Sequence, residues 1–151
     1  SNRPEVVEAD GETGLVKALH GLAEKIRTRA IVLIFSDLFC DSTALLNCLQ
    51  HLRFQKHDVA VFHLLDRMEL EFKFDRPIRF EDLESSFNLV TEPATVRDEY
   101  LRQLDLFLEQ IRRGCQEFRV DYRRVITDEN YEKVLADFLV ERARRAALGA
   151  V

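Results

Sequence analysis

The feature of this sequence that most constrains its fold is a continuous apolar run that ends in a carboxylate. Residues 31–39 read IVLIFSDLF, and Asp37 follows the run after a single serine. Because apolar and polar residues do not alternate in residues 31–35, we expect a strand that is buried on both faces. Such strands are typical of parallel sheets that carry helices on each side.

Two further segments repeat this arrangement. Residues 59–65, VAVFHLL, form a second apolar run, and Asp66 follows it. Residues 120–126 form a third candidate strand, which ends at Thr127 and Asp128. Apolar residues at helical spacing lie before, between and after these strands, in residues 15–26, 45–52, 96–118 and 131–139. The alternation predicts an α/β fold, a three-layer sandwich with a mostly parallel sheet and helices on both faces.

The middle of the chain has a different pattern. Residues 69–74, ELEFKF, alternate strictly, which predicts a half-exposed strand. Residues 78–83 and 87–90 then resemble the two arms of a β-hairpin that projects from the edge of the sheet. Further on, Gly114 interrupts a helical pattern at a cost of about 1 kcal/mol relative to alanine. A close approach to a neighbouring backbone would explain that glycine.

Composition limits the classes of function. The 151 residues suit one domain, and a net charge of −5 without a sustained basic stripe excludes nucleic acid as the main partner. No apolar stretch approaches the roughly 20 residues of a membrane span. The three cysteines are odd in number and contain no C-x-x-C pair, so we expect packing residues in a reducing, cytoplasmic compartment.

The strand ends are the candidate site. The carboxyl ends of parallel strands meet at one edge of a sheet, where ligands gather, and this places Asp37, Asp66 and Asp128 along the same edge. Each aspartate can be solvated, cap a turn, or coordinate a hard cation through oxygen. His63 lies within a buried strand and is expected to be a hydrogen-bonded core histidine. The other three histidines are expected at the surface: His20, His51 and His57.

Several motifs together carry a family resemblance. They are S-D-L-F-x-D at residues 36–41, H-D-V at 57–59, F-H-L-L-D at 62–66, E-L-E-F at 69–72, R-F-E-D-L-E at 79–84 and R-R-G-C at 112–115. With them the chain resembles the C-terminal half of domain-of-unknown-function family 58. This is a bacterial family with a von Willebrand factor A-like fold, whose genes often neighbour those of MoxR-type AAA+ ATPases.

The resemblance implies a metal-ion-dependent adhesion site. Thr13 matches the family's threonine ligand and Asp37 matches its aspartate ligand. Ser36 and Asp41 would lie next to these ligands and help to hold them in place. Mg²⁺ suits such oxygen ligands. The D-x-S-x-S motif that supplies the remaining ligands does not occur in this sequence. We therefore expect Mg²⁺ in the intact protein only and none bound to this chain.

The resemblance also implies that part of the family's domain is missing from this sequence. The first strands of the family's sheet have no counterpart here, so residues 1–151 are expected to form a single truncated von Willebrand factor A-like domain. Residues 31–35 would then be an edge strand with free N–H and C=O groups. Such edges pair with other chains, so we expect self-association through this strand, or its shielding by the N-terminal segment.

Three functions stay open at this point. The resemblance implies a non-catalytic protein-interaction module that works with a MoxR-type AAA+ ATPase, or with its client, in the assembly or maturation of protein complexes. A metal-dependent phosphoester hydrolase, built on Asp37, Asp66 and His63, is the enzymatic alternative. The third candidate function is a structural interaction module that docks its partner through residues 69–90 and needs no metal. Its aromatic side chains either contact a partner or pack the hairpin onto the sheet: Phe72, Phe74, Phe80 and Phe87.

Overall fold

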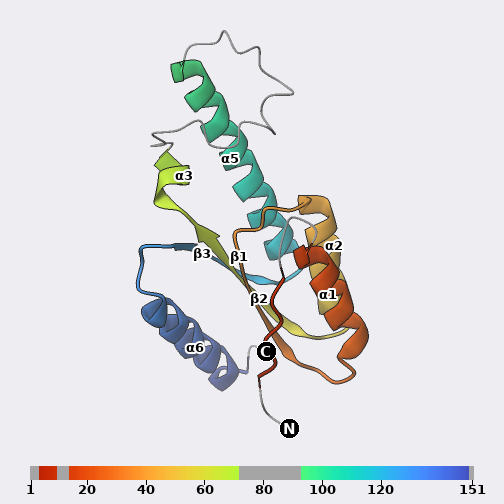
Figure 1. Ribbon diagram of the computed structural model, residues 1–151. Coiled ribbons are helices and arrows are strands. Elements are labelled where there is room, and N and C mark those ends of the chain that lie inside the picture. The colour runs from red at the N-terminus through yellow and green to blue at the C-terminus, as the bar shows by residue number, and fades with distance from the viewer. Residues whose placement is uncertain (1–3, 10–13, 72–92, 150–151) are drawn as a thin grey trace.

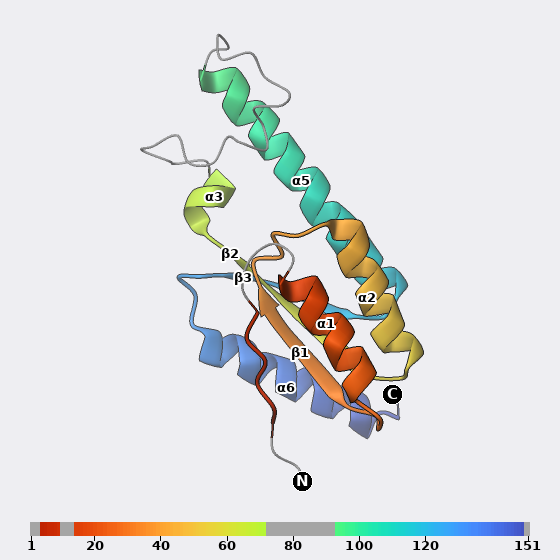
Figure 2. The same ribbon diagram turned by 45° about the vertical axis from the view of Figure 1, so that its right-hand side comes forward.

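A computed structural model describes residues 4–9, 14–71 and 93–149 of the chain, and it shows three layers (Figures 1 and 2). Helices α1, α2 and α5 cover one face of a parallel sheet, and α6 covers the other. The predicted α/β sandwich is thus confirmed. The elements are α1 (Gly14–Lys25), β1 (Ile31–Ser36), α2 (Ser42–Phe54), β2 (Asp58–Leu65), α3 (Arg67–Glu71), α5 (Pro93–Glu117), β3 (Asp121–Ile126) and α6 (Tyr131–Ala147).

The described sheet has the strand order β1-β2-β3, and both strand pairs are parallel. Ile31 pairs with Asp58 at the start of β1, and Ser36 pairs with His63 at its end. Across the other side of β2, Leu65 pairs with Ile126. The three strands therefore end at one edge of the sheet, as the candidate site requires.

The central strand is buried on both faces, as its continuous apolar run predicts. Val59, Val61 and Phe62 are among its most buried side chains. Val59 and Val61 belong to the larger core, which packs against α1, α2 and α5. Phe62 belongs to a smaller core on the opposite face, where it meets Phe138 of α6.

The edge strand β1 differs from its prediction. Val32 and Ile34 are buried, but Ile31, Leu33 and Phe35 are 55%, 42% and 50% exposed. Burial of both faces was therefore predicted wrongly for β1. The reason is that α6 packs over β2 and β3 through Phe138, and this leaves the same face of β1 uncovered.

The described part of the N-terminal segment, residues 4–9, does not cover this strand. Residues 4–9 run alongside β1 in Figure 2, but their side chains are exposed and they form no strand pairing with it. The exposed face of β1 therefore stays open to solvent in the part of the chain that the structure describes. Residues 4–9 therefore do not provide the predicted shielding; residues 1–3 and 10–13 of the N-terminal segment lie outside the described residues.

Local chemistry explains where the helices begin and end. Asp41 caps α2, since its carboxylate accepts hydrogen bonds from the backbone N–H groups of Thr43 and Ala44. Asn130 caps α6 in the same way. Lys56 and Arg119, with φ angles of 67° and 56°, stand in the left-handed region just after α2 and α5. These two turns lead directly into β2 and β3.

Gly114 does lie at a close approach, but the neighbour is a side chain. A Cβ atom added at Gly114 would lie 2.4 Å from Cδ2 and 3.0 Å from Cγ of Leu46. The glycine therefore lets α5 pack tightly on α2. In the described residues, no helix is both long and apolar enough to span a membrane.

Candidate functional site

The carboxyl ends of β1 and β2 present three acidic side chains, which we call the acidic rim: Asp37, Asp66 and Glu69. Asp37 follows β1 and Asp66 follows β2, the two adjacent parallel strands, and both side chains are exposed. Glu69 is half-buried in α3. Burial raises the pKa of Glu69, and the nearby charges of Asp66 and Asp37 raise it further. The three carboxylates thus share one field of negative charge.

The turn from Ser36 to Asp41 is built by its own side chains. The Ser36 hydroxyl accepts a hydrogen bond from the Leu38 N–H at 3.0 Å, and Asp37 Oδ1 accepts one from the Phe39 N–H at 3.1 Å. Leu38 has a φ of 57° and is buried, so it anchors the turn in the core at some backbone cost. The S-D-L-F-x-D motif therefore specifies a turn that holds the Asp37 carboxylate outward.

Residues 67–71 form helix α3, where the sequence pattern predicted a strand from residue 69 onward. Asp66 Oδ1 accepts the N–H of Met68 at 2.8 Å, and the Glu69 carboxylate accepts a backbone hydrogen bond from Asp66. This reciprocal arrangement is a capping box, and it fixes a helix start at Arg67. The strand prediction is wrong for residues 69–71, because the D-x-x-E spacing outweighs the alternation; residues 72–74 of the predicted strand lie outside the described residues. The same spacing is the signal that could have placed Glu69 in the site.

The third strand-end aspartate is neutralised. Arg67 donates two hydrogen bonds to Asp128, from Nε at 2.7 Å and from Nη2 at 3.2 Å. These hydrogen bonds and the charge of Arg67 lower the pKa of Asp128. The predicted edge of three aspartates therefore contains two whose carboxylates accept local backbone hydrogen bonds and one held in an ion pair.

His63 is a core histidine, as expected. Its side chain is 0% exposed, and its Nε2 lies 2.9 Å from the carbonyl oxygen of Asp37. Because a carbonyl only accepts, Nε2 carries the proton, and Nδ1 accepts the hydroxyl hydrogen of Tyr122 at 2.8 Å. Burial lowers the pKa of His63 to about 4. Both ring nitrogens are thus engaged beneath the rim, and His63 fixes the end of β1 rather than facing solvent.

Cys40 lies in the same turn as a protonated thiol. Burial, and then the charges of Asp41 and Asp37, raise its pKa to about 11. The thiolate is the reactive form of cysteine, so this side chain is a poor nucleophile at neutral pH. Cys48 and Cys115 are buried members of the larger core, in agreement with their predicted packing role.

Comparison with known families agrees with this description. The family described as "Protein of unknown function DUF58" matches residues 5–105. The chain belongs to the DUF58 family. No curated protein and no solved structure matches it. The match includes both aspartates and the glutamate of the acidic rim, whereas β3 and α6 of this DUF58 chain lie beyond it.

The described residues of the DUF58 chain offer only some of the ligands that the resemblance implies for a metal ion. Among the described residues, no group of three or more His, Cys, Asp or Glu side chains is arranged to hold a metal. Asp37 has one oxygen in the turn, and Asp41 serves as the cap of α2. Thr13 lies outside the described residues, as do the four phenylalanines of the predicted hairpin. The rim residues on their own therefore do not make a Mg²⁺ site.

Proposed function

We propose that this DUF58 chain is a cytoplasmic, non-catalytic protein-interaction module and that the acidic rim is its docking surface. The proposal rests on the exposure and the hydrogen bonds of Asp37 and Asp66. Both carboxylates are exposed on adjacent strands, and each accepts a hydrogen bond from a backbone N–H two residues later. Exposed carboxylates at the carboxyl ends of adjacent parallel strands suit contact with a partner protein.

The partner class follows from the family resemblance. A von Willebrand factor A-like domain docks through this edge of its sheet, and family-58 genes often neighbour those of MoxR-type AAA+ ATPases. We therefore propose that the partner is such an ATPase or its client and that the module serves complex assembly or maturation. The hydrolase alternative is less favoured, because His63 is buried with both nitrogens engaged and Cys40 is held as a thiol.

We expect Asp37→Asn to weaken ATPase binding about tenfold, which is the effect of losing one charge-assisted contact of about 1.4 kcal/mol. Asparagine can still accept the Phe39 N–H, so the turn persists and only the charge is lost. Biolayer interferometry with a MoxR-type AAA+ ATPase from the same organism measures the change, with and without EDTA. Asp137→Asn removes an exposed carboxylate from α6 and should leave the affinity unchanged. Equal affinity of wild type and Asp37→Asn would refute the rim as the docking surface.

We also propose that the open edge of β1 pairs with a second copy of the chain. The outer face of this strand exposes Ile31, Leu33 and Phe35, and among the described strands β1 pairs with β2 alone. Its remaining N–H and C=O groups form a template for strand addition. The two features together favour association through an apolar sheet edge.

Leu33→Lys is expected to convert associated chains into monomers, because a charge on an edge strand opposes pairing. Sedimentation velocity measures the distribution of species. Leu139→Lys places the same charge at an exposed apolar position of α6 and should not change the association. A wild-type chain that sediments as a monomer over the whole concentration range would contradict this prediction.

A further inference from the structure

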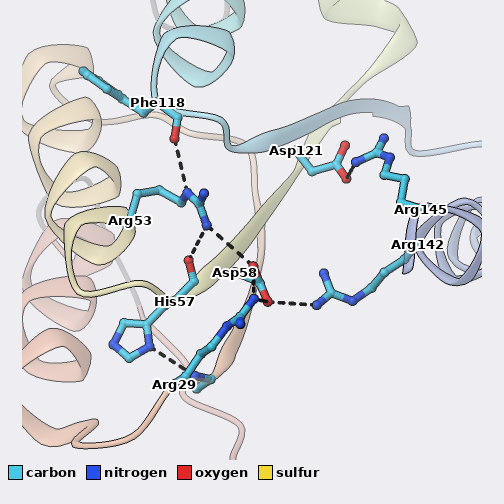
Figure 3. A network of polar contacts seen from close by, with 9 residues as sticks. Arg29, Arg53, His57, Asp58, Phe118, Asp121, Arg142 and Arg145 are labelled. Atoms are coloured by element: carbon cyan, nitrogen blue, oxygen red, sulfur yellow. Dashed lines mark hydrogen bonds and ion pairs between the residues drawn. The ribbon is translucent and has the colours of Figure 1, made fainter. Parts of the chain in front are cut away.

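At the amino ends of the strands, opposite the acidic rim, the structure has a cleft of about 1150 Å³. It lies between the end of α2, the turn that precedes β3 and the last turns of α6 (Figure 3). Isoleucine, alanine and phenylalanine side chains form an apolar part of its lining: Ile31, Ala60 and Phe138. We call it the basic cleft because of the six cationic side chains that line it: Arg29, Arg53, Lys56, Arg119, Arg142 and Arg145.

The charge of the basic cleft opposes that of the whole chain. Six cations and two carboxylates, Asp58 and Asp121, line the cleft, an excess of four positive charges among the lining residues. Glu141, which is not part of the lining, also pairs with Arg145 at 3.7 Å. The net charge of the full sequence is −5. The chain therefore separates its charge, with the acidic rim at one edge of the sheet and the basic cleft at the other. Such a concentration of one sign in a concave surface attracts ligands of the other sign.

Asp58 organises the arginines of the cleft (Figure 3). Its carboxylate lies 3.1 Å from Arg29, 3.0 Å from Arg142 and 3.6 Å from Arg53. Burial by itself would raise the pKa of Asp58, but hydrogen bonds and charge from Arg142 and Arg29 lower it, so the carboxylate is ionised. One carboxylate cannot neutralise three guanidinium groups, and Arg–carboxylate geometry leaves other donors of each fork directed elsewhere.

Part of this network is structural. Arg53 donates to the backbone carbonyl oxygens of His57 at 2.8 Å and Phe118 at 3.3 Å, and so joins the ends of α2 and α5 (Figure 3). Arg145 is paired with Asp121 at 3.1 Å. Cations near helix C-termini are also stabilised by the helix dipole. These roles account for Arg53 and Arg145, which we do not assign to ligand binding.

Lys56 and Arg119 have no such structural partner. Both are exposed, and neither side chain forms a hydrogen bond or ion pair with the rest of the described residues. They line the same cleft from two different turns, each at a left-handed backbone position. Arg29 and Arg142 add partly exposed guanidinium groups, with 60% and 37% of their side chains exposed. The cleft thus presents cations from four separate segments beside an apolar surface.

We propose that the basic cleft binds an extended acidic segment of a partner protein. Charge complementarity and the preference of arginine for planar carboxylates favour such a ligand. The apolar lining would take the side chains between its acids. A phosphate is less suited, because α1, α2, α5 and α6 all direct their C-termini toward the amino ends of the strands, so none of these described helices supplies N-terminal N–H donors to the cleft.

The proposal is independent of the acidic rim. The cleft lies at the other edge of the sheet, and Arg119, Arg142 and Arg145 fall beyond the residues matched by the family. Failure of one site would therefore leave the other untouched. In particular, Asp37→Asn should not change the affinity of the basic cleft for an acidic peptide.

The test uses a short fluorescein-labelled peptide in which glutamate alternates with valine, followed by fluorescence anisotropy. We expect binding that weakens with added salt, and about tenfold weaker binding to the double variant Lys56→Gln/Arg119→Gln. The matched control is Lys17→Gln/Lys133→Gln, which removes the same charge at exposed positions outside the cleft and should bind like wild type. Circular dichroism checks that both double variants are folded.

Four results would overturn the proposal. The first is no binding of the glutamate–valine peptide at low salt. The second is an equal loss of affinity in the two double variants, because the attraction would then be unspecific. The third is displacement of the peptide by inorganic triphosphate at lower concentration than by unlabelled peptide, which would make the cleft a phosphate site. A glutamine–valine peptide should not bind, and equal affinity for it would also contradict the proposal.

Discussion

Phe62→Ala is expected to lower the free energy of unfolding by about 4 kcal/mol, within the range for a buried phenylalanine in a core. The Phe62 side chain is 1% exposed. Its ring stacks on Phe35 at a centroid distance of 4.7 Å and meets the edge of Phe138 at 5.2 Å. The smaller core contains few other large side chains, so the cavity would separate α6 from the sheet.

The matched control is Phe35→Ala, because it removes the same ring from the neighbouring strand. Phe35 is 50% exposed, so its loss should cost about 1–2 kcal/mol. Urea denaturation followed by circular dichroism measures both values. Similar losses for the two variants would mean that the face of β1 beside α6 is covered in solution, contrary to the structure.

The free energy of unfolding is expected to fall by about 3 kcal/mol between pH 6.5 and pH 4 because of His63 alone, since each pKa unit corresponds to about 1.36 kcal/mol. Burial holds the pKa of His63 at about 4 in the folded chain, against 6.5 for the free side chain. Between these values the unfolded state binds the proton and the folded state does not. The contribution is therefore complete above pH 6.5 and is lost as the pH falls toward 4.

His63→Gln isolates this contribution. Glutamine can donate to the Asp37 carbonyl and accept from Tyr122, but it does not titrate. Urea denaturation at several pH values should show a shallower dependence for the variant between pH 4 and 6.5. Asp58 and Asp128 have lowered pKa values, so their effects fall below this window. Identical slopes for wild type and variant would show that His63 is accessible to protons in the folded chain.

The order of elements in the described chain could be predicted because periodicity and caps are local properties. The apolar runs gave β1 and β2, and Asp41 marked the start of α2. The exposure of the strands was harder to predict, because β1 and β2 have similar apolar runs. Only the position of α6 leaves one face of β1 uncovered. His57 was expected at the surface but is buried, with Nδ1 accepting the Ala30 N–H at 3.2 Å.

The candidate site could be predicted in position but not in composition. A carboxylate that follows a buried parallel strand must emerge at the sheet edge, so Asp37 and Asp66 were found from the sequence. Glu69 was not predicted as a site residue, because the alternation of its neighbours indicated a strand. The capping-box spacing from Asp66, which marks a helix start, was not taken into account. The basic cleft was missed for another reason: its cations come from segments more than 100 residues apart, such as Arg29 and Arg142, and only the fold brings them together.

The central claim is that the carboxyl edge of the sheet, with Asp37 and Asp66, is the surface that docks a partner. Hydrogen–deuterium exchange of the chain, with and without the MoxR-type ATPase, tests it most directly. The account predicts slower exchange on binding in residues 36–41 and in α3, with no change at the amino ends of β1 and β2. Slower exchange confined to those amino ends, or none in residues 36–41, would contradict it.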